Sequence, residues 1–528
     1  MLRRHSLYPV ELQAHPFLCS FNHKTKTGSI GKARRCDKMA KMIKKIPKEI
    51  KKIIETLTKA KFEVYLVGGC VRDLILGQQP KDWDVATNAK PEQLTKLFPH
   101  SFCDNNFGTV DVLTGSKDPS LKGVEITPYR VDGVYEDKRH PQKVKFTKHL
   151  KEDLARRDFT INAMAMKVEG EEVSLIDLFQ GQEDLKKKVV RAVGEPDQRF
   201  DEDALRMMRA VRFATTLDFA IEPLTQKAIK KHAADIQVIS KERVRDELVK
   251  IIKNSRAAEG IELLRTVGLL SFIIPELSES YGVAQNKHHI YDVYEHSVRT
   301  LKYAVTQDFS FAIRLAGLLH DVGKPATKEG EGEDATFYNH EVVGAKMTEK
   351  ILSRLRFSRQ EIKQIVRLVR YHLFYYNVDE VGEASVRKLV RRVGRENMDD
   401  LIKVRMSDRI GSGVPKAKPY KLRHLEYMVE RVSRDPLTTA CLAISGQEVM
   451  DLLKIKPGPK VGQVLSILLD QIINDPKKNK AAYLKKEIEK IGKLSSKKLN
   501  VRVQEARKAI EEIREKKDIM TKKKYWVQ

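Results

Sequence analysis

The stretch Leu66-Val-Gly-Gly-Cys-Val-Arg-Asp73, followed closely by Lys81-Asp-Trp-Asp84, decides the fold of the N-terminal part of the chain. A strand-like run over residues 62–67 meets a double glycine, after which a short helix over 71–76 is expected. Glycine lets backbone N–H groups approach phosphate oxygens without a Cβ in the way. Arg72 lies one turn into that helix and can reach the same phosphates, so this segment is a candidate phosphate-binding site.

Two carboxylates follow on the next expected strand. Asp82 and Asp84 are two residues apart, and a period of two places both on one face of a strand. Paired carboxylates in this arrangement can hold two Mg²⁺ ions for in-line phosphoryl transfer. Such sites need a third carboxylate that takes a proton from the attacking hydroxyl. The alternating segment Val124-Glu-Ile-Thr127 favours Glu125, and Asp111 is the competitor.

A third set of polar residues follows the head of the chain. Two adjacent arginines in Ala155-Arg-Arg-Asp158 can clamp a triphosphate or form a surface salt-bridge cluster. In Glu202-Asp-Ala-Leu-Arg-Met-Met-Arg-Ala-Val-Arg212 an Asp and three Arg recur every three residues, along one side of an expected helix over 203–214. Asp203 can accept from an exocyclic amine while Arg206 donates beside it, which suits cytosine and adenine but not guanine or uracil.

Residues 64–214 resemble the class II CCA-adding enzymes, which are tRNA nucleotidyltransferases, and their poly(A) polymerase relatives. The motifs are GGCVRD, KDWDVAT, VEITPYR, EDLARRDFTINAMA and EDALRMMRAVRFA, in this order. The resemblance implies an α+β protein with a polymerase-β-type nucleotidyltransferase head, followed by an all-α neck, body and tail. It implies that Mg²⁺ is bound by Asp82 and Asp84 and that the nucleotide is contacted by Gly69, Arg72, Arg157, Asp203, Arg206, Arg209 and Arg212. Residues 129–141 resemble the family's flexible loop, which argues against addition of CC alone.

A second resemblance covers the middle of the chain. The segment His320-Asp-Val-Gly-Lys324, with a histidine 24 residues upstream and a late aspartate, resembles the HD superfamily of metal phosphohydrolases. The ligands it implies are His296, His320, Asp321 and Asp408, while His340 and His372 support a second ion or bind phosphate. Imidazole nitrogen and carboxylate oxygen suit Mn²⁺, Ni²⁺, Mg²⁺ or Fe²⁺. The alternative is a fold kept only as an RNA-binding scaffold.

The helical pattern of the remaining sequence completes the predicted organisation. We expect a basic N-terminal extension, a head, a helical neck for nucleotide and RNA binding, an HD domain, a helical tail for tRNA, and a Lys-rich C-terminal extension that is either an exposed helix or a frayed tail. The boundaries are 1–45, 46–180, 181–275, 276–412, 413–492 and 493–528. In the tail, Ile455-Lys-Pro-Gly-Pro-Lys-Val-Gly462 is either an RNA-backbone contact or a simple connector.

Composition sets limits on the class of protein. The chain of 528 residues has 99 Lys and Arg against 72 Asp and Glu, a net charge of +27, which points to a polyanionic partner such as nucleic acid. Five scattered cysteines (Cys19, Cys36, Cys70, Cys103, Cys441) argue against disulfides and thiolate zinc and favour a reducing, cytoplasmic location. No transmembrane run is visible. Residues 1–40 are expected to be a disordered arm or sequence upstream of a start at Met39 or Met42, with a weak organellar presequence as the alternative.

The sequence thus predicts addition of CCA to the 3′ end of tRNA from CTP and ATP, with Mg²⁺ at the head and a divalent transition metal at the HD site. An enzyme that adds only A, or a poly(A) polymerase, would share every head motif. From other classes, the alternatives are an HD phosphohydrolase acting on RNA ends or nucleotides and an inactive RNA-binding protein. Intact Asp82, Asp84 and Arg157 speak against both of these. The oligomeric state stays open.

Overall fold

The structure is a computed structural model that describes residues 42–104, 108–132, 144–170, 172–285, 290–378, 380–433, 439 and 442–527. Most of the predicted N-terminal extension and of the predicted flexible loop therefore lies outside the described residues. The described chain divides into two units, one built from the head and one built from residues 182–527 together with short segments at 132–145 and 157–160. Within the described part, no helix is both long and apolar enough to cross a bilayer.

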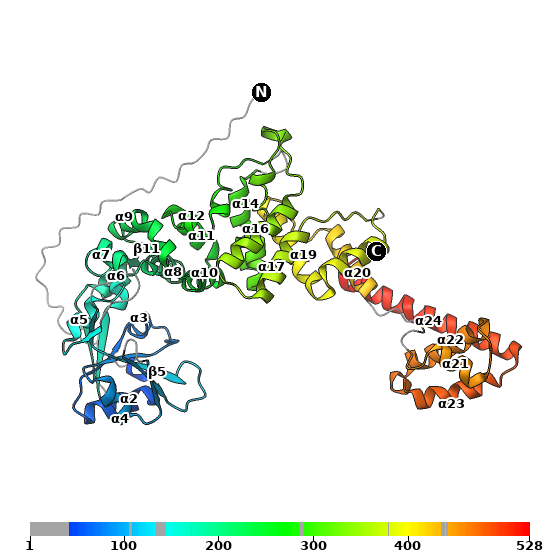
Figure 1. Ribbon diagram of the computed structural model, residues 1–528, viewed down its shortest axis with the longest axis horizontal. Coiled ribbons are helices and arrows are strands. Elements are labelled where there is room, and N and C mark those ends of the chain that lie inside the picture. The colour runs from blue at the N-terminus through cyan, green and yellow to red at the C-terminus, as the bar shows by residue number, and fades with distance from the viewer. Residues whose placement is uncertain are drawn as a thin grey trace, which may run out of the picture. The chain divides into compact units, whose positions relative to one another are not determined.

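The head, coloured blue to cyan in Figure 1, is built on one mixed sheet of seven strands. The strand order is β3-β4-β5-β2-β1-β8-β9. Its strands are β1 (Val64–Val67), β2 (Asp84–Thr87), β3 (Ser101–Asp104), β4 (Thr109–Leu113), β5 (Gly123–Pro128), β8 (Met164–Glu169) and β9 (Glu172–Asp177). A separate pair joins β6 (Arg130–Asp132) to β7 (Val144–Phe146). The pairing of β2 with β5 is parallel, whereas β1 pairs antiparallel with both β2 and β8.

Four helices complete the head, and the first shows why they form. Helix α2 (Lys48–Lys59) buries Ile50, Ile53, Ile54 and Leu57, the apolar positions whose helical spacing is visible in the sequence. The others are α3 (Gly69–Ile75), α4 (Pro91–Leu97) and α5 (Leu150–Ala155). Strand β1 runs directly into α3, so the double glycine lies at the end of a buried strand and beside β2.

The second unit is helical from its first residues, as the sequence predicts, apart from the short parallel pair β10 (Val189–Val190) and β11 (Ala220–Ile221). Its first helices are α6 (Gly181–Lys187), α7 (Pro196–Glu202), α8 (Leu205–Leu217), α9 (Pro223–His232), α10 (Lys241–Lys253), α11 (Ala257–Thr266), α12 (Leu270–Ile273) and α13 (Pro275–Ser278). Helix α8 packs against both α10 and α11, and α11 also packs against α14 of the next group.

The middle helices carry the HD motif. They are α14 (Val293–Thr306), α15 (Phe311–Leu319), α16 (His340–Arg354), α17 (Arg359–Tyr371), α18 (Glu383–Val393) and α19 (Met398–Gly411). Helix α14 packs closely on α19, and the absence of a side chain at Gly411 permits this approach. A Cβ at Gly411 would collide with the Thr300 hydroxyl. Likewise, a Cβ at Gly323 would collide with the carbonyl of His340, so the turn after α15 lies against the start of α16.

The last helices form two apolar cores joined by one long helix. They are α20 (Tyr420–Ser433), α21 (Gly446–Leu453), α22 (Pro459–Asn474), α23 (Ala481–Gly492) and α24 (Ser496–Tyr525). One core gathers α21, α22 and α23 around residues such as Val449, Leu468 and Ile488. The other gathers α18, α20 and the C-terminal end of the chain. The C-terminal stretch is thus a continuous helix in the structure.

Candidate active site and candidate metal centre

A row of three carboxylates crosses the head sheet. Asp84 on β2 lies in register with Glu125 on β5, and Glu125 lies in register with Asp111 on β4. Residues in one register row of neighbouring strands lie side by side and present their side chains to the same face. The structure therefore brings together the predicted Asp84, the favoured third carboxylate and its competitor, with Glu125 directly beside Asp84 and Asp111 one strand further away.

This row concentrates negative charge. Burial raises the pKa of Glu125, and the charges of Asp84, Asp111 and Asp82 raise it further. Asp82 is exposed and lies just before β2. The sequence pattern predicted that the strand begins at Asp82, but in the structure it begins at Asp84. The buried Trp83 fixes the chain between them. A set of oxygen donors with this much mutual repulsion fits a hard divalent cation such as Mg²⁺.

The predicted phosphate-binding segment has the geometry that its glycines require. Gly68 has φ of +76°, a conformation that favours glycine, and it immediately precedes α3. Arg72 donates from Nη1 to the side-chain oxygen of Asn162 at 2.7 Å and from Nε to Asp73 at 2.9 Å. The guanidinium is therefore held in one orientation next to Gly69, whose Cβ position lies 3.6 Å from Arg72 Nη2. Asn162 was missed by sequence reasoning, since 90 residues separate it from its partner.

The predicted base-reading pair lies at the junction of two helices. Asp203 is not inside the helix, as its spacing suggested, but adopts an extended conformation between α7 and α8. The reason is local, because its carboxylate accepts from the backbone N–H of Leu205 at 3.0 Å and so stabilises the start of α8. Its other oxygen accepts from Arg243 Nη2 of α10 at 3.1 Å. Arg243 was also missed, because a partner 40 residues away leaves no local signal.

The three arginines of α8 each lie against a carboxylate. Arg206 is buried and pairs with Glu202. Arg209 pairs through Nε and Nη2 with Asp158, at 2.8 and 2.5 Å, and the charge of Asp158 raises the pKa of Arg209 despite burial. Arg212 pairs with Glu247 of α10; burial lowers its pKa in spite of that carboxylate. The helix that starts beside Asp203 is thus fixed by a network of ion pairs.

The two arginines of the predicted triphosphate clamp, Arg156 and Arg157, differ in their surroundings. Arg156 pairs with the buried carboxylate of Asp153, at 3.0 Å from Nε and 2.7 Å from Nη2. Arg157, the predicted phosphate ligand, is neither fully buried nor fully exposed. Arg156 is thereby accounted for as a structural residue, and the phosphate-binding role predicted for Arg157 stays a prediction.

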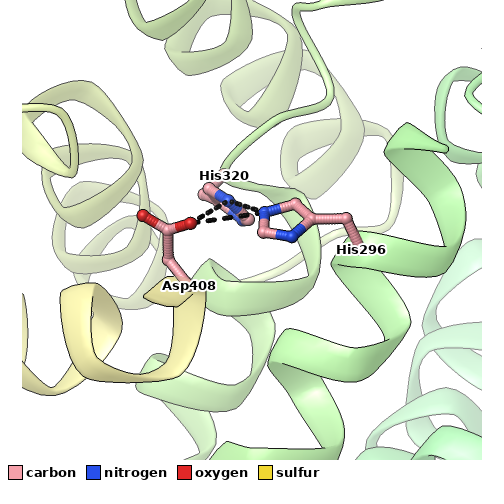
Figure 2. A group of neighbouring side chains, drawn as sticks. All are labelled: His296, His320 and Asp408. Atoms are coloured by element: carbon pink, nitrogen blue, oxygen red, sulfur yellow. Dashed lines mark hydrogen bonds and ion pairs between the residues drawn. The ribbon is translucent and has the colours of Figure 1, made fainter. Parts of the chain in front are cut away.

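The six predicted HD residues converge in a buried cluster. His296 comes from α14, His320 and Asp321 follow α15, His340 begins α16, His372 follows α17, and Asp408 lies on α19. The Nε2 atoms of His296 and His320 lie 3.0 Å apart, and each is 3.2 Å from Asp321 Oδ2. Asp408 Oδ1 lies 3.3 Å from His296 Nε2 and 3.7 Å from His320 Nε2 (Figure 2). All six side chains are buried.

The second pair of histidines faces the other oxygen of the same aspartate. His340 Nε2 lies 3.4 Å from Asp321 Oδ1, and His372 Nε2 lies 3.6 Å from it. Asp321 therefore stands between two histidine pairs, one on each carboxylate oxygen. In His320, His340 and His372 the Nδ1 atom lies 2.7–2.8 Å from the carbonyl of Gly317, Phe337 or Val369. Such a contact fixes the ring and leaves Nε2 as the donor atom for a metal.

Electrostatics divide the cluster into two halves. Burial lowers the pKa of His320, but the charges of Asp321 and Asp408 outweigh it and raise that pKa to about 10. The same two aspartates raise the pKa of His296 against the effect of burial. In contrast, burial and the charge of His320 lower the pKa of His372 to about 3, so this imidazole is neutral. Buried Nε2 and carboxylate oxygens without a thiolate fit a divalent metal ion.

One residue of the HD segment had no predicted role. The buried Lys324 lies with Nζ 2.7 Å from Asp321 Oδ2 and donates to Gln285 Oε1 at 2.6 Å. It follows Asp321 by three residues, so both project from the same turn. The lysine therefore fixes the carboxylate that faces both histidine pairs and adds a positive charge beside it.

Fold and site together define a nucleotidyltransferase head joined to a helical region that carries an HD-type cluster. Three family models match the chain: the poly A polymerase head domain over residues 64–191, the probable RNA and SrmB-binding site of polymerase A over 218–280, and the HD domain over 293–410. A CCA-adding enzyme of Lactobacillus delbrueckii subsp. bulgaricus is 34% identical over 439 residues, which are 82% of this chain and 95% of the relative.

Two further relatives extend the comparison. An A-adding tRNA nucleotidyltransferase of Deinococcus radiodurans is 40% identical over 337 residues, 61% of this chain and 75% of the relative. The crystal structure of the Bacillus stearothermophilus CCA-adding enzyme in complex with CTP superposes with a TM-score of 0.53 at 25% identity, covering 84% of this chain and 98% of that one. The chain belongs to the tRNA nucleotidyltransferase family that includes the CCA-adding enzymes, and it carries an HD domain.

Proposed function

We propose that this protein adds CCA to the 3′ end of tRNA, using CTP twice and ATP once and releasing pyrophosphate at each step. The observation that carries the proposal is the row of carboxylates beside the Gly68–Gly69 turn, in a chain that matches a CCA-adding enzyme over 95% of that enzyme's length. Phosphoryl transfer depends mainly on positioning and charge stabilisation, which this row and the fixed Arg72 supply.

The residues divide the chemistry among them. Asp82, Asp84 and Glu125 hold Mg²⁺, which when bound neutralises charge on the phosphates. Gly69 and Arg72 bind the triphosphate together with Arg157. The 3′ hydroxyl oxygen forms a bond to the α-phosphorus, the bond from that phosphorus to the pyrophosphate oxygen breaks, and Glu125 accepts the hydroxyl proton.

Base selection is proposed to lie with Asp203 and Arg206. The contact with Arg243 and the hydrogen bond from Leu205 fix the Asp203 carboxylate, and the pair with Glu202 fixes Arg206. Arg209 and Arg212 hold α8 in place for this pair through Asp158 and Glu247. A fixed acceptor beside a fixed donor selects the amine-bearing edges of cytosine and adenine.

Addition of A alone is the second candidate, because the Deinococcus radiodurans relative bears that name and is 40% identical. The test offers three tRNAs, ending before CCA, after C and after CC, each with a single nucleotide. A CCA-adding enzyme extends the first two with CTP and the third with ATP. An A-adding enzyme extends only the third, and a poly(A) polymerase continues beyond one A on any of them.

We further propose that the HD cluster binds divalent metal and hydrolyses phosphate esters of RNA ends or nucleotides. The support is geometric: His296 and His320 face one oxygen of Asp321, His340 and His372 face the other, and Asp408 lies against His296 and His320. A divalent metal held by these residues would activate water and stabilise negative charge on the phosphate. Lys324 holds Asp321 and favours an anionic substrate. The test measures release of phosphate from RNA ends and nucleotides with Mn²⁺, Ni²⁺ or Mg²⁺ added separately.

The remaining helices are proposed to bind RNA through phosphates. The basic excess of the whole chain extends into the tail, where residues 442–510 carry 15 Lys and Arg against 7 Asp and Glu. Together with the absence of a cysteine framework, a tRNA substrate fits action in the cytoplasm. The domain boundaries given above remain part of this proposal.

A further inference from the structure

Helix α24 belongs to two separate cores. Its N-terminal half buries Leu499, Val503, Ala506 and Ile510, and the first two of these belong to the apolar core formed by α21, α22 and α23. Its C-terminal end reaches the other core, where Tyr525 and Val527 pack with α18 and α20. One continuous helix of 30 residues, about 45 Å long at 1.5 Å per residue, therefore connects the basic tail to the helices next to the HD domain.

The middle of α24 packs in neither core. Residues 511, 512 and 514–517 are exposed, and only Ile513 among residues 511–517 is partly buried. The stripe that packs in the tail continues here with charged residues, Arg514 and Lys517, which line an open groove of about 1380 Å³. The opposite wall of the groove comes from α18 and α20, through Glu383, Arg387 and Arg431. The helix thus crosses a gap between two cores.

Specific contacts fix the C-terminal end of this crossing. Tyr427 donates to Asp518 at 2.7 Å, and Tyr525 and Lys524 donate to Glu430 at 2.8 and 2.7 Å. A polar helix without a packed face has marginal stability by itself, because helix nucleation is unfavourable and few tertiary contacts stabilise the helix. The contacts at both ends of α24 hold its terminal turns in helical conformation, so the exposed turns between them continue an existing helix. The helix then keeps the two cores at a fixed distance.

We propose that α24 is a strut that sets the distance between the basic tail and the HD-bearing body, and so selects RNA long enough to contact both. This rests on the proposed function of the chain as a tRNA-extending enzyme. A rigid connection keeps the tail and the body at one distance from each other. RNA that binds both regions then does not have to order a flexible linker, which would cost entropy. RNA too short to reach the tail does not benefit from the strut.

The experiment uses two matched variants of the full-length protein. One carries Glu512→Gly, Glu515→Gly and Lys516→Gly, and the other carries Ala at the same three positions. Both remove the same charges from exposed positions, so they differ only in helix propensity. Three Gly in place of three Ala disfavour the helix by roughly a hundredfold in total. Trypsin, which can still cut after Arg514 and Lys517, should cut residues 511–517 at least about tenfold faster in the Gly variant than in the Ala variant.

The functional readout compares two RNAs, a whole tRNA lacking CCA and a short hairpin with the same 3′ end. In the Gly variant kcat/KM should fall about tenfold for the tRNA and stay unchanged for the hairpin, while the Ala variant matches the parent on both. Equal values for the two variants, or equal losses on both RNAs, would overturn the strut. If the parent extends neither RNA, the proposed function fails instead, and the ratio of the two RNAs' Kd values then tests the strut in the same way.

Discussion

The head site and the HD cluster assemble their candidate metal ligands in opposite ways. In the head, carboxylates from neighbouring strands stand in one register row, and Asp82, just before that row's β2 strand, is exposed. In the HD cluster the six residues come from five helical segments spread over 112 positions, and all are buried. The head is thus suited to a metal that arrives with a nucleotide, and the HD cluster to a resident metal held by imidazole.

The largest effect should follow from removing a carboxylate of the row. Asp84→Ala should lower nucleotide addition by at least about a thousandfold, because the transferred phosphate loses its metal, while tRNA Kd changes less than about twofold. Single-turnover extension and filter binding measure the two quantities. Asp118→Ala, an exposed aspartate outside the row, is the control. A loss of binding as large as the loss of catalysis would show that Asp84 serves folding or RNA binding.

The HD cluster should respond independently of the head. Asp321→Ala removes the carboxylate that faces both histidine pairs, so any phosphohydrolase activity should fall by at least about a hundredfold and bound metal should be lost, with CCA addition retained. Metal content of the purified variant and its extension rate give the two readings. Collapse of nucleotide addition in a folded Asp321→Ala protein would show that the two sites are coupled.

A smaller effect is expected at the base-reading turn. Asp203→Ala should reduce the ratio of kcat/KM for CTP over UTP by about tenfold to a hundredfold, since uracil would no longer place an oxygen against a fixed carboxylate. Arg243→Ala should move the same ratio in the same direction but less, because it only holds Asp203 in place. Arg157→Ala should weaken all four nucleotides alike. An unchanged ratio in Asp203→Ala would remove this residue from base selection.

A further predicted effect is a pH dependence of metal binding at the HD cluster. The pKa values of His296 and His320 are raised by Asp321 and Asp408, so metal must displace a proton that is held more tightly than usual. Affinity for Mn²⁺ should therefore rise about tenfold per pH unit and per displaced proton between pH 6 and 8. Calorimetric titration in this range checks the slope. A Kd independent of pH would mean that these histidines are not ligands.

The two sites also differ in how far sequence could predict them. The head motif is local, so the double glycine, Arg72 and Asp84 could be placed from spacing, although the start of β2 was placed two residues too early and the start of α3 two residues too late. Strands β3, β6, β8 and β9 were missed. In β8 nearly every residue is buried, so the alternation that identifies a strand is absent. The HD ligands were predicted by family resemblance, since no periodicity connects positions so far apart.

Partners in the folded chain explain what sequence could not supply. Asn162, Arg243 and Gln285 act on Arg72, Asp203 and Lys324 across 90, 40 and 39 residues, so that only the fold brings each pair together. The contact between the C-terminal end of α24 and α20 could not be predicted from sequence either. The charged pattern of residues 494–524 predicts an exposed helix whether or not its end packs in a second core.

The most direct test of the central claim is the sequence of the product formed on one substrate. A tRNA that ends before CCA is incubated with purified protein, CTP and ATP together, and the new 3′ ends are sequenced. The account predicts three added nucleotides, C, C and A in that order, with no further extension. No extension, a product with A at the first position, or a longer tail of A would contradict it.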